Sequence, residues 1–322
     1  MTAANSEKSS SRLPIAIFGA GGIAQKAYLP LLATWPDAHI LGIYSRTRER
    51  LDRTLAAWPI EFGATDLDAL LALHPAAAFV LTATPSHFEV AGKLLEAGID
   101  VYLEKPATTS AGLTRRLADL AKEKGRILMV GYNRRYALLY KQAREIFGER
   151  HIQLFVIEKH RPETPHPTLA AQYLDDIIHQ IDLMRFFCGD VTAVHTSYEL
   201  KNDRLAGAVS IVALPGGGLG TILTSQQAGG WQEKVALHGD GLTVEVSAFR
   251  ELRVKYRDHE EIYGTDRPGR WVPELTERGF HDEIRHFFDC VRTREQPLTD
   301  GYEAAKSQEL EEALVEGAEE IS

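Results

Sequence analysis

Short apolar runs alternate with amphipathic stretches over the first 135 residues of the chain. Five runs have the length of a strand and carry β-branched or aromatic residues: LPIAIF, HILGIY, AAAFVL, DVYLE and RILMVG. Between them, apolar residues recur at helical spacing in 47–58, 86–98 and 110–125. Strands that alternate with helices form βαβ units. Residues 12–135 therefore predict an α/β domain with a doubly wound parallel sheet.

The rhythm changes after residue 135, where several strand-like runs follow one another without helices between them. The run VALHGDGLTVEV predicts a hairpin, because two alternating segments flank Gly-Asp-Gly. Helices are expected near 168–188, 276–293 and 301–318. The expected strands are 152–160, 191–200, 207–214, 218–227, 233–238 and 242–247. Residues 136–322 thus predict an α+β domain with an open, mainly antiparallel sheet. Its uncovered face favours a homodimer or homotetramer.

Composition narrows the class of protein. The 322 residues carry a net charge of −9, which argues against binding to nucleic acid or to anionic membranes. No apolar run approaches the roughly 18–20 residues of a membrane helix, and the Ser-rich residues 1–11 are expected to be a disordered tail. Cys188 and Cys290 lie in apolar runs, which favours free thiols in a reducing compartment. We therefore expect a cytoplasmic protein.

A glycine-rich turn joins the first strand to the first helix. Gly19 permits a tight turn, Gly21 lets the backbone approach a pyrophosphate, and Ala24 lets helix and strand pack closely. The helix that begins here offers free N–H groups to phosphates, and Gly22 and Ile23 lie in the same turn. A turn without a ligand is the alternative interpretation. Its position in the first βα unit favours a dinucleotide site.

The end of the second strand indicates which dinucleotide binds. An NAD site places a carboxylate there to bind the ribose 2′-hydroxyl. The chain instead has Ser45 and Arg46, which could bind a 2′-phosphate, while Glu49 lies one turn inside the next helix. This favours NADP over NAD, although Arg46 could also be a solvated residue at the start of a helix.

Later motifs give the chain a family resemblance. Together with the glycine turn, the segments TPSH, EKP, GYNRR and LDDIIHQID resemble the glucose-fructose oxidoreductase/inositol dehydrogenase/rhizopine-catabolism (Gfo/Idh/MocA) family. GGIAQKAYLP, EKHRPETPHP and LTERGF are similar to its MviM branch. The resemblance spans nearly the whole chain. It implies a Rossmann domain followed by an α+β domain with an open sheet, and an NAD(P)-dependent oxidoreductase.

Three residues are expected to carry the chemistry. Lys105 follows a parallel strand, where ligands of open α/β sheets bind, and its ammonium can stabilise a developing alkoxide. The resemblance places Asp175 and His179 in the family's Asp-x-x-x-His pair at the catalytic cleft. Histidine has a suitable pKa for removing a hydroxyl proton. Spacing predicts that Asp175, His179 and Asp182 share one helix face.

The remaining site predictions surround these three residues. Asp182 is expected to be structural, Asp176 to be a surface or salt-bridge residue, and Arg135 to be a possible interdomain partner. A metal held by Asp175, His179 and a histidine of EKHRPETPHP is the less favoured interpretation, and no metal is expected. The further residues expected to bind cofactor are Thr84, Pro85, His87, Glu104, Lys105, Asn133 and Arg134. Those expected to bind substrate are Lys105, Tyr132, His160, Asp175 and His179.

The expected activity follows from the motifs and the resemblance together. It is hydride transfer between NADP, with NAD as the other possibility, and a secondary alcohol or ketone of a sugar, polyol or related carbohydrate. The carbohydrate class comes from the resemblance alone. Two alternatives stay open: a redox-neutral enzyme with tightly bound dinucleotide, including a glycoside-cleaving one, and a dinucleotide-binding sensor without catalysis.

Overall fold

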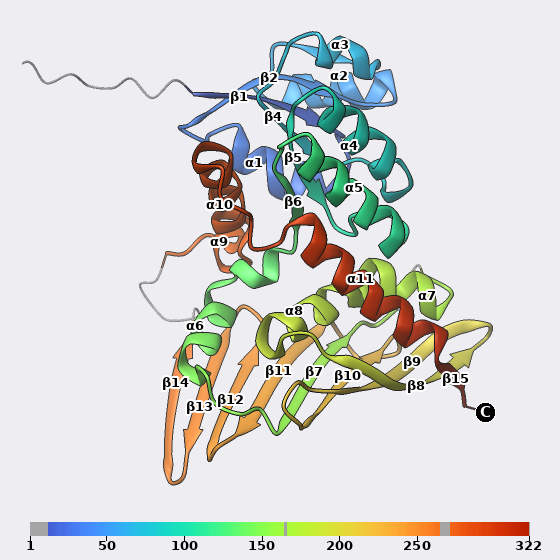
Figure 1. Cartoon of the computed structure of the whole chain (residues 1–322), viewed down its shortest axis with the longest axis vertical. Coiled ribbons are helices and arrows are strands. Elements are labelled where there is room, and N and C mark those ends of the chain that lie inside the picture. The colour runs from blue at the N-terminus through green and yellow to red at the C-terminus, as the bar shows by residue number, and fades with distance from the viewer. Residues whose placement is uncertain (1–11, 164–165, 265–270, 322) are drawn as a thin grey trace, which may run out of the picture.

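Two sheets with helices between them form the molecule (Figure 1). The computed structural model describes residues 12–163, 166–264 and 271–321, so the tail expected at 1–11 lies outside the described residues. In Figure 1 the parallel sheet lies above the larger sheet, and α11, α8 and α6 lie between them. No helix in the described ranges combines the length and the apolar character needed to cross a membrane.

The first sheet has six strands in the order β3-β2-β1-β4-β5-β6, and every pairing is parallel. The predicted doubly wound sheet is therefore confirmed. The sequence did not reveal the two-residue β3 or the short α3 after it. The strands are β1 (Leu13–Phe18), β2 (Ala38–Tyr44), β3 (Gly63–Ala64), β4 (Ala77–Val80), β5 (Asp100–Glu104) and β6 (Leu128–Gly131).

Helices cover both faces of this sheet because its strands are apolar on both sides. Val101 and Leu103 pack with α4 and α5, whereas the alternate residue Tyr102 packs on the opposite side. There the sheet meets α1 and the much later α10, whose Phe287 is fully buried, as the aromatic spacing predicted. The helical elements in this part of the chain are η1 (Ala24–Tyr28), α1 (Leu29–Leu32), α2 (Arg48–Ala57), α3 (Leu67–Leu71), η2 (Thr84–Ser86), α4 (His87–Glu96) and α5 (Ala111–Glu123).

The second sheet has nine strands in the order β14-β13-β12-β11-β7-β10-β9-β8-β15. Only β7·β10 and β8·β15 are parallel, so the mainly antiparallel sheet is confirmed. The predicted hairpin turns at Asp240 and Gly241, both of which have positive φ. The strands are β7 (Leu154–His160), β8 (Thr192–Lys201), β9 (Arg204–Ala213), β10 (Leu219–Ser225), β11 (Gln232–Gly239), β12 (Leu242–Ser247), β13 (Glu251–Tyr256), β14 (His259–Gly264) and β15 (Ala318–Glu320).

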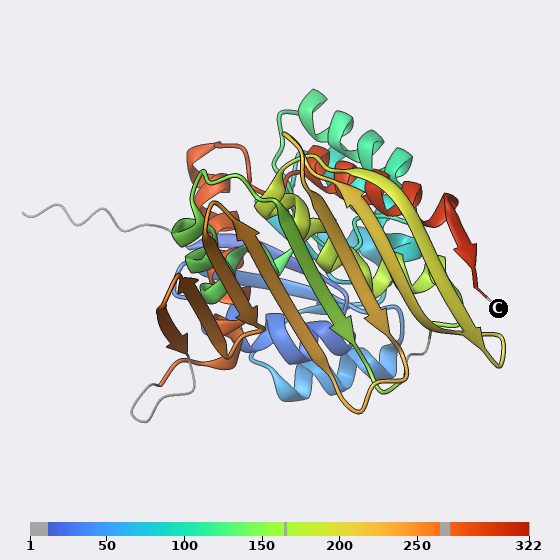
Figure 2. The same ribbon diagram turned by 90° about the horizontal axis from the view of Figure 1, so that it is seen from below.

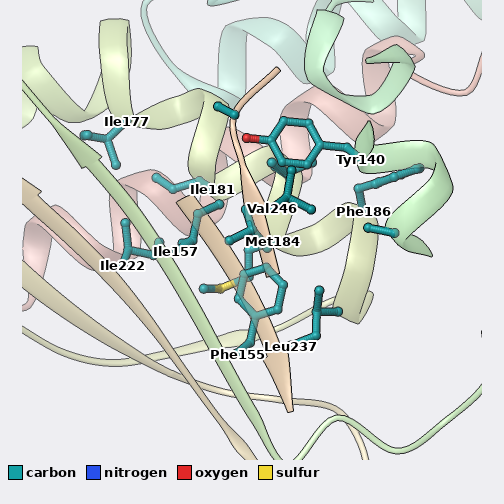
Figure 3. Close-up of a cluster of buried hydrophobic side chains, with 14 of the residues drawn as sticks. Tyr140, Phe155, Ile157, Ile177, Ile181, Met184, Phe186, Ile222, Leu237 and Val246 are labelled. Carbon is teal, nitrogen blue, oxygen red and sulfur yellow. The ribbon is translucent and has the colours of Figure 1, made fainter. Parts of the chain in front are cut away.

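One face of the second sheet is covered by helices. Figure 3 shows Phe155 and Ile157 of β7 packed beneath Ile181 and Met184 of α8, with Tyr140 of α6 beside them. The helical elements after residue 132, of which α10 packs on the first sheet, are η3 (Asn133–Tyr136), α6 (Leu138–Phe147), α7 (Leu169–Gln172), η4 (Tyr173–Ile177), α8 (Ile178–Cys188), α9 (Glu274–Glu277), α10 (Phe280–Thr293) and α11 (Gly301–Glu316). The expected helix over 168–188 is thus present, interrupted by the π-helical turn η4.

The opposite face carries no helix from the described residues (Figure 2). Apolar side chains, including Leu154, Val209 and Leu219, are exposed on its strands. Cys188 and Cys290 are both free thiols; Cys290 is buried and Cys188 is partly buried. The predicted boundary between the two domains at residue 135 stays a prediction. α10, which comes late in the chain, packs in the core of the first sheet.

Candidate active site

The glycine turn borders a cavity of about 510 Å³ at the carboxyl ends of the parallel strands. Gly19 has φ +121°, and a Cβ there would lie 2.5 Å from the carbonyl carbon of Leu81. Hypothetical Cβ atoms on Gly21 and Gly22 would instead have no protein atom within 4 Å, and both residues line the cavity. The backbone therefore leaves open space where a pyrophosphate would approach.

The rest of the cavity wall agrees in part with the predicted cofactor residues. Ser45 and Arg46 line it at the end of β2, as expected. Arg50, which sequence reasoning missed, lines it one helical turn after Arg46; that spacing was the available signal. Glu49 pairs with Arg53 outside the cavity wall. The set fits a bound dinucleotide.

The turn after β4 meets the cavity through Thr82, Ala83 and Ser86, whereas the predicted Thr84 and Pro85 are not among the lining residues. His87 is buried and lies between two backbone carbonyls. Its Nε2 is 2.9 Å from the Thr82 oxygen, and its Nδ1 is 3.0 Å from the Pro106 oxygen. Burial lowers the pKa of His87. The ring therefore ties this turn to the segment that carries Lys105.

Lys105 and Asp175 meet, as predicted. The Lys105 ammonium donates to the Asp175 backbone oxygen at 2.5 Å and to its carboxylate at 3.1 Å, across the gap between the two halves of the chain. The Asp175 carboxylate also lies 2.8 Å from His166 Nε2. Burial opposes the charge of Asp175, but Lys105 and His166 outweigh it and lower the pKa of this carboxyl. An ammonium and a carboxylate from the two halves of the chain thus stand together, and both side chains are partly exposed.

His179 lies one turn further along the same helical segment. Its Nδ1 is buried without a hydrogen-bond partner among the described residues. Burial lowers the pKa of His179 well below its ordinary value, and the nearby charges of Arg134 and Lys105 lower it further. The imidazole is therefore neutral at neutral pH and keeps a lone pair that can accept a proton.

Asp176 is buried rather than on the surface, and its predicted salt-bridge role is confirmed. Its carboxylate binds Lys159 at 2.7 Å and accepts two hydrogen bonds from Arg161, at 2.6 and 2.7 Å. Burial, reinforced by the charge of Arg134, lowers the pKa of Lys159 to about 7. Lys159 stands opposite Glu233 in the pairing of β7 with β11.

Glu233 was not singled out from the sequence. It is buried and accepts two hydrogen bonds from Arg134, at 2.6 and 2.8 Å. The predicted cofactor residue Arg134 therefore spans from η3 to the second sheet. Asn133 donates to the Arg278 backbone oxygen at 2.8 Å. A cofactor role for either residue stays a prediction.

His160 does not reach this cluster. Side chains alternate across a strand, so Phe155, Ile157 and Lys159 share the face of β7 that meets the helices, whereas His160 lies on the other face. There it contacts Glu158 at 3.2 Å and accepts a hydrogen bond from the Ser225 backbone at 3.0 Å. The structure therefore does not bring His160 to the Lys105–Asp175 pair, and its substrate contact stays a prediction; Lys159 and Arg161 are the residues of this segment that bind Asp176. The apolar period of β7 was a usable signal.

Two other predicted residues, Glu104 and Tyr132, are buried. Glu104 accepts a hydrogen bond from the Tyr28 hydroxyl at 2.9 Å, and burial raises the pKa of this carboxyl. The Tyr132 hydroxyl has no partner among the described residues, and burial raises its pKa. Within those residues no group of three or more His, Cys, Asp or Glu side chains could hold a metal ion.

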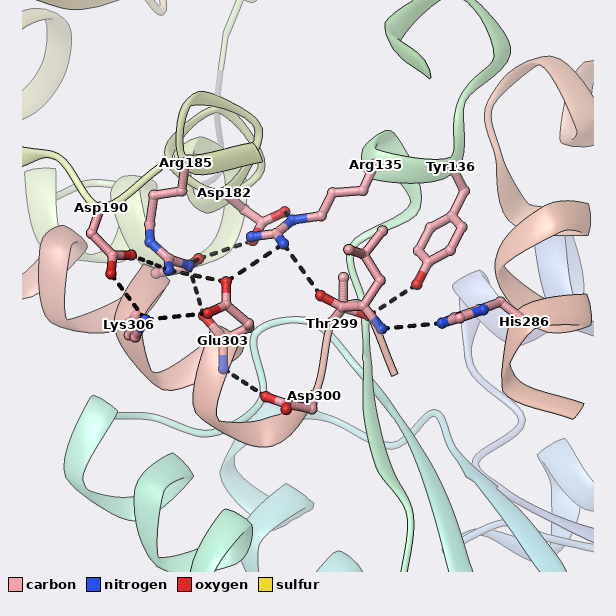
Figure 4. A network of polar contacts seen from close by, with 12 residues as sticks. Arg135, Tyr136, Asp182, Arg185, Asp190, His286, Thr299, Asp300, Glu303 and Lys306 are labelled. Carbon is pink, nitrogen blue, oxygen red and sulfur yellow. Dashed lines mark hydrogen bonds and ion pairs between the residues drawn. The ribbon is translucent and has the colours of Figure 1, made fainter. Parts of the chain in front are cut away.

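Asp182 is structural, as predicted, but it does not share a face with Asp175. Its carboxylate binds the Arg135 guanidinium at 2.7 and 2.8 Å and accepts from Ser307 at 2.9 Å (Figure 4). The π-helical turn Tyr173–Ile177 explains the difference, because it changes the angular offset along the helix. Arg135 and Asp182 thus form the interdomain ion pair that the sequence suggested for Arg135.

Known proteins share this architecture and these motifs. Residues 13–132 match the model of the oxidoreductase family GFO_IDH_MocA, with an NAD-binding Rossmann fold. The chain is 33% identical to "Putative oxidoreductase YceM" of Salmonella typhimurium over 94% of this chain and 97% of that protein. The dehydrogenase MviM from Clostridium difficile superposes with a TM-score of 0.86 at 25% identity, over 93% of this chain and 97% of the other.

A third protein shares the fold at lower identity. KijD10, a 3-ketoreductase from Actinomadura kijaniata solved with NADP and TDP-benzene, gives a TM-score of 0.82 at 21% identity, over 97% of this chain and 99% of that one. The full-length match to YceM and the Rossmann match extend the motif resemblance to the whole chain. By these criteria the chain is an oxidoreductase of the Gfo/Idh/MocA family.

Proposed function

We propose that the protein is an NADP(H)-preferring oxidoreductase that interconverts a secondary alcohol and a ketone of a sugar, polyol or related carbohydrate. The observation that carries this proposal is the Lys105–Asp175 contact close to a neutral His179, in a chain whose open glycine turn lines a separate cavity. The substrate class follows from the family.

The dinucleotide would lie along the glycine turn, and its nicotinamide ring supplies or accepts the hydride when it is bound. The residues of the chain handle the proton and the charge. Neutral His179 accepts the hydroxyl proton during oxidation and returns it during reduction. The Lys105 ammonium stabilises the alkoxide charge that develops on the same oxygen, and Asp175 fixes the position of the ammonium.

The preference for NADP rests on charge at the end of β2. Arg46 and Arg50 line the cavity there with Ser45. A 2′-phosphate would receive charge-assisted hydrogen bonds from these side chains. That KijD10 was solved with NADP is consistent with this preference.

Replacing Lys105 with Met tests the assignment. Removal of one preorganised charge stabiliser lowers kcat by about 10²–10³-fold, whereas NADPH affinity stays within a few-fold. Both are measured by nicotinamide absorbance and fluorescence with a panel of sugars and polyols. Lys124→Met is the control, because Lys124 pairs with Glu96 outside the cleft. Equal turnover of Lys105→Met and the parent protein would refute the role of Lys105.

The same assay separates the alternatives. Product formation without net change of the nicotinamide absorbance would identify a redox-neutral enzyme. Tight NADPH binding without product from any substrate would favour a sensor.

We further propose that a second copy of the chain covers the exposed apolar side chains of the nine-stranded sheet, such as Val209 and Leu219.

A further inference from the structure

We propose that the substrate carries a carboxylate and that Arg161 binds it. This inference rests on the proposed function, because it names the class of molecule that the same site oxidises or reduces. The expected substrate is a carbohydrate acid, in which a carboxylate lies within the width of one sugar ring of the reacting hydroxyl.

The first observation is an imbalance of charge around His179. Among the described residues, four cations surround this imidazole, and they interact with three carboxylates. Lys105 pairs with Asp175, and Arg134 pairs with Glu233. Lys159 and Arg161 both bind the single carboxylate of Asp176. Because the pKa of Lys159 is about 7, the group holds one cation more than it holds carboxylates at neutral pH and below, which favours an anion as its ligand there.

The second observation concerns which cation can reach a ligand. Lys159 and Arg134 are buried, with 1% and 9% of their side chains exposed. Arg161 is 36% exposed and binds Asp176 through Nε and one terminal nitrogen, Nη2. Its Nη1 has no hydrogen-bond partner among the described residues. Arginine has five N–H donors in a planar fork, so the free edge of Arg161 can bind a carboxylate while Asp176 stays bound.

The third observation is the position of Arg161 relative to the reacting groups. Asp176, which holds Arg161, precedes His179 by three residues on one continuous helical segment. The charge of Arg161 is among those that act on His179. We infer from this proximity that a hydroxyl at His179 and a carboxylate at Arg161 belong to one small molecule. Asp176 acts as a positioning residue that fixes the guanidinium.

A second explanation of the extra cation is that it only stabilises the alkoxide of a neutral substrate. The two explanations differ in what they predict for matched ligands. If Arg161 binds a carboxylate, glucuronate exceeds glucose and galacturonate exceeds galactose. If the charge serves the alkoxide alone, the two members of each pair behave alike.

The experiment compares these pairs on the full-length protein with NADP(H) present. Dissociation constants come from the fluorescence of bound NADPH, and kcat/KM comes from nicotinamide absorbance. We expect the acid to bind at least about tenfold more tightly than its neutral partner. Arg161→Gln abolishes the difference and Arg161→Lys keeps part of it. Arg253→Gln, which removes a half-exposed arginine paired with Glu251 on β13, leaves it unchanged.

The readouts keep failure of this inference separate from failure of the proposed function. Turnover of neutral sugars as good as that of the acids would overturn the carboxylate proposal and leave the oxidoreductase intact. Absence of turnover with every ligand would count against the proposed function. The binding preference for acids and its dependence on Arg161 would still decide the carboxylate proposal. Thermal unfolding of each variant checks that the protein still folds. We expect it to fold, because Asp176 keeps Lys159 and Gln172 as partners when Arg161 is replaced.

Discussion

The pH dependence of stability measures how strongly burial disfavours the charge of Lys159. Its ammonium is almost fully buried, and burial lowers its pKa to about 7 from an ordinary value of 10.5. Between these two pH values the unfolded chain binds a proton that the folded chain has released. The free energy of unfolding therefore rises with pH in this window. From the two pKa values, the rise between pH 7 and pH 9 is about 2 kcal/mol.

The perturbation is Lys159→Met, which removes the charge and keeps an unbranched side chain. Asp176 retains Arg161 and Gln172 as partners, so no buried carboxylate is left unpaired. Urea unfolding at several pH values between 7 and 9 gives the slope for each protein. The variant loses about 2 kcal/mol of the pH-dependent rise. Burial raises the pKa of Glu311 to about 8, so its ionisation lowers the free energy of unfolding as pH increases in part of this range. Glu311 is present in both proteins, and its contribution cancels in the difference.

The same substitution has a catalytic consequence. Lys159 is one of the cations that lower the pKa of His179, after burial and Arg134. Its removal moves the acid limb of kcat/KM for alcohol oxidation to higher pH, because the imidazole then keeps its proton longer. Lys255→Met, on the same sheet but half exposed and paired with Glu245, serves as control. An unfolding slope identical in Lys159→Met and the parent protein would show that this ammonium is not desolvated and would refute the reasoning.

Two predictions concern the cofactor cavity. Gly19→Ala destabilises the fold by about 1–3 kcal/mol or more in urea unfolding, because of its positive φ and the contact with Leu81; Gly21→Ala unfolds like the parent but binds NADPH at least about tenfold more weakly. Gly21→Ala with unchanged affinity would contradict the open approach. Arg46→Ala weakens NADPH about tenfold and NADH little, whereas Arg48→Ala, which removes a partner of Asp52, changes neither. Equal losses for both nucleotides would reject the 2′-phosphate site.

Local patterns predicted most of the parallel sheet, because β4, β5 and β6 are buried on both faces and the long helices around them are amphipathic. They failed for β13 and β14, where charged residues such as Arg253, Lys255 and Glu260 occupy exposed positions near the sheet edge. β13 pairs with β12 and buries Leu252, whereas β14 is mostly exposed and is held by its pairing with β13. The hydrophobic pattern is therefore short in β13 and absent in β14.

The candidate site was predictable to the extent that its chemistry is local. Lys105 at the end of a strand and the Asp175–His179 spacing could be identified directly. The partners could not, because Arg134 and Glu233 are 99 residues apart and meet only when the second sheet folds against η3. The period of two along β7 assigns Lys159, and not His160, to the helix-covered face, which the prediction for His160 did not take into account.

The π-helical turn at Tyr173–Ile177 explains why ideal helical periodicity wrongly placed Asp175 and Asp182 on one face of this helical segment. In this turn the Asp175 carbonyl accepts a hydrogen bond from Lys105 and the Asp176 carbonyl accepts one from Lys159. Lys105 comes from the first domain and Lys159 from the second sheet. Two ammonium groups from opposite sides therefore bind one irregular turn, in which Asp175 faces Lys105 and Asp176 faces Lys159 and Arg161. Adjacent aspartates that would look equivalent in sequence thereby acquire different partners, Asp175 in the contact that we propose to be catalytic and Asp176 bound to the guanidinium that we propose binds the carboxylate.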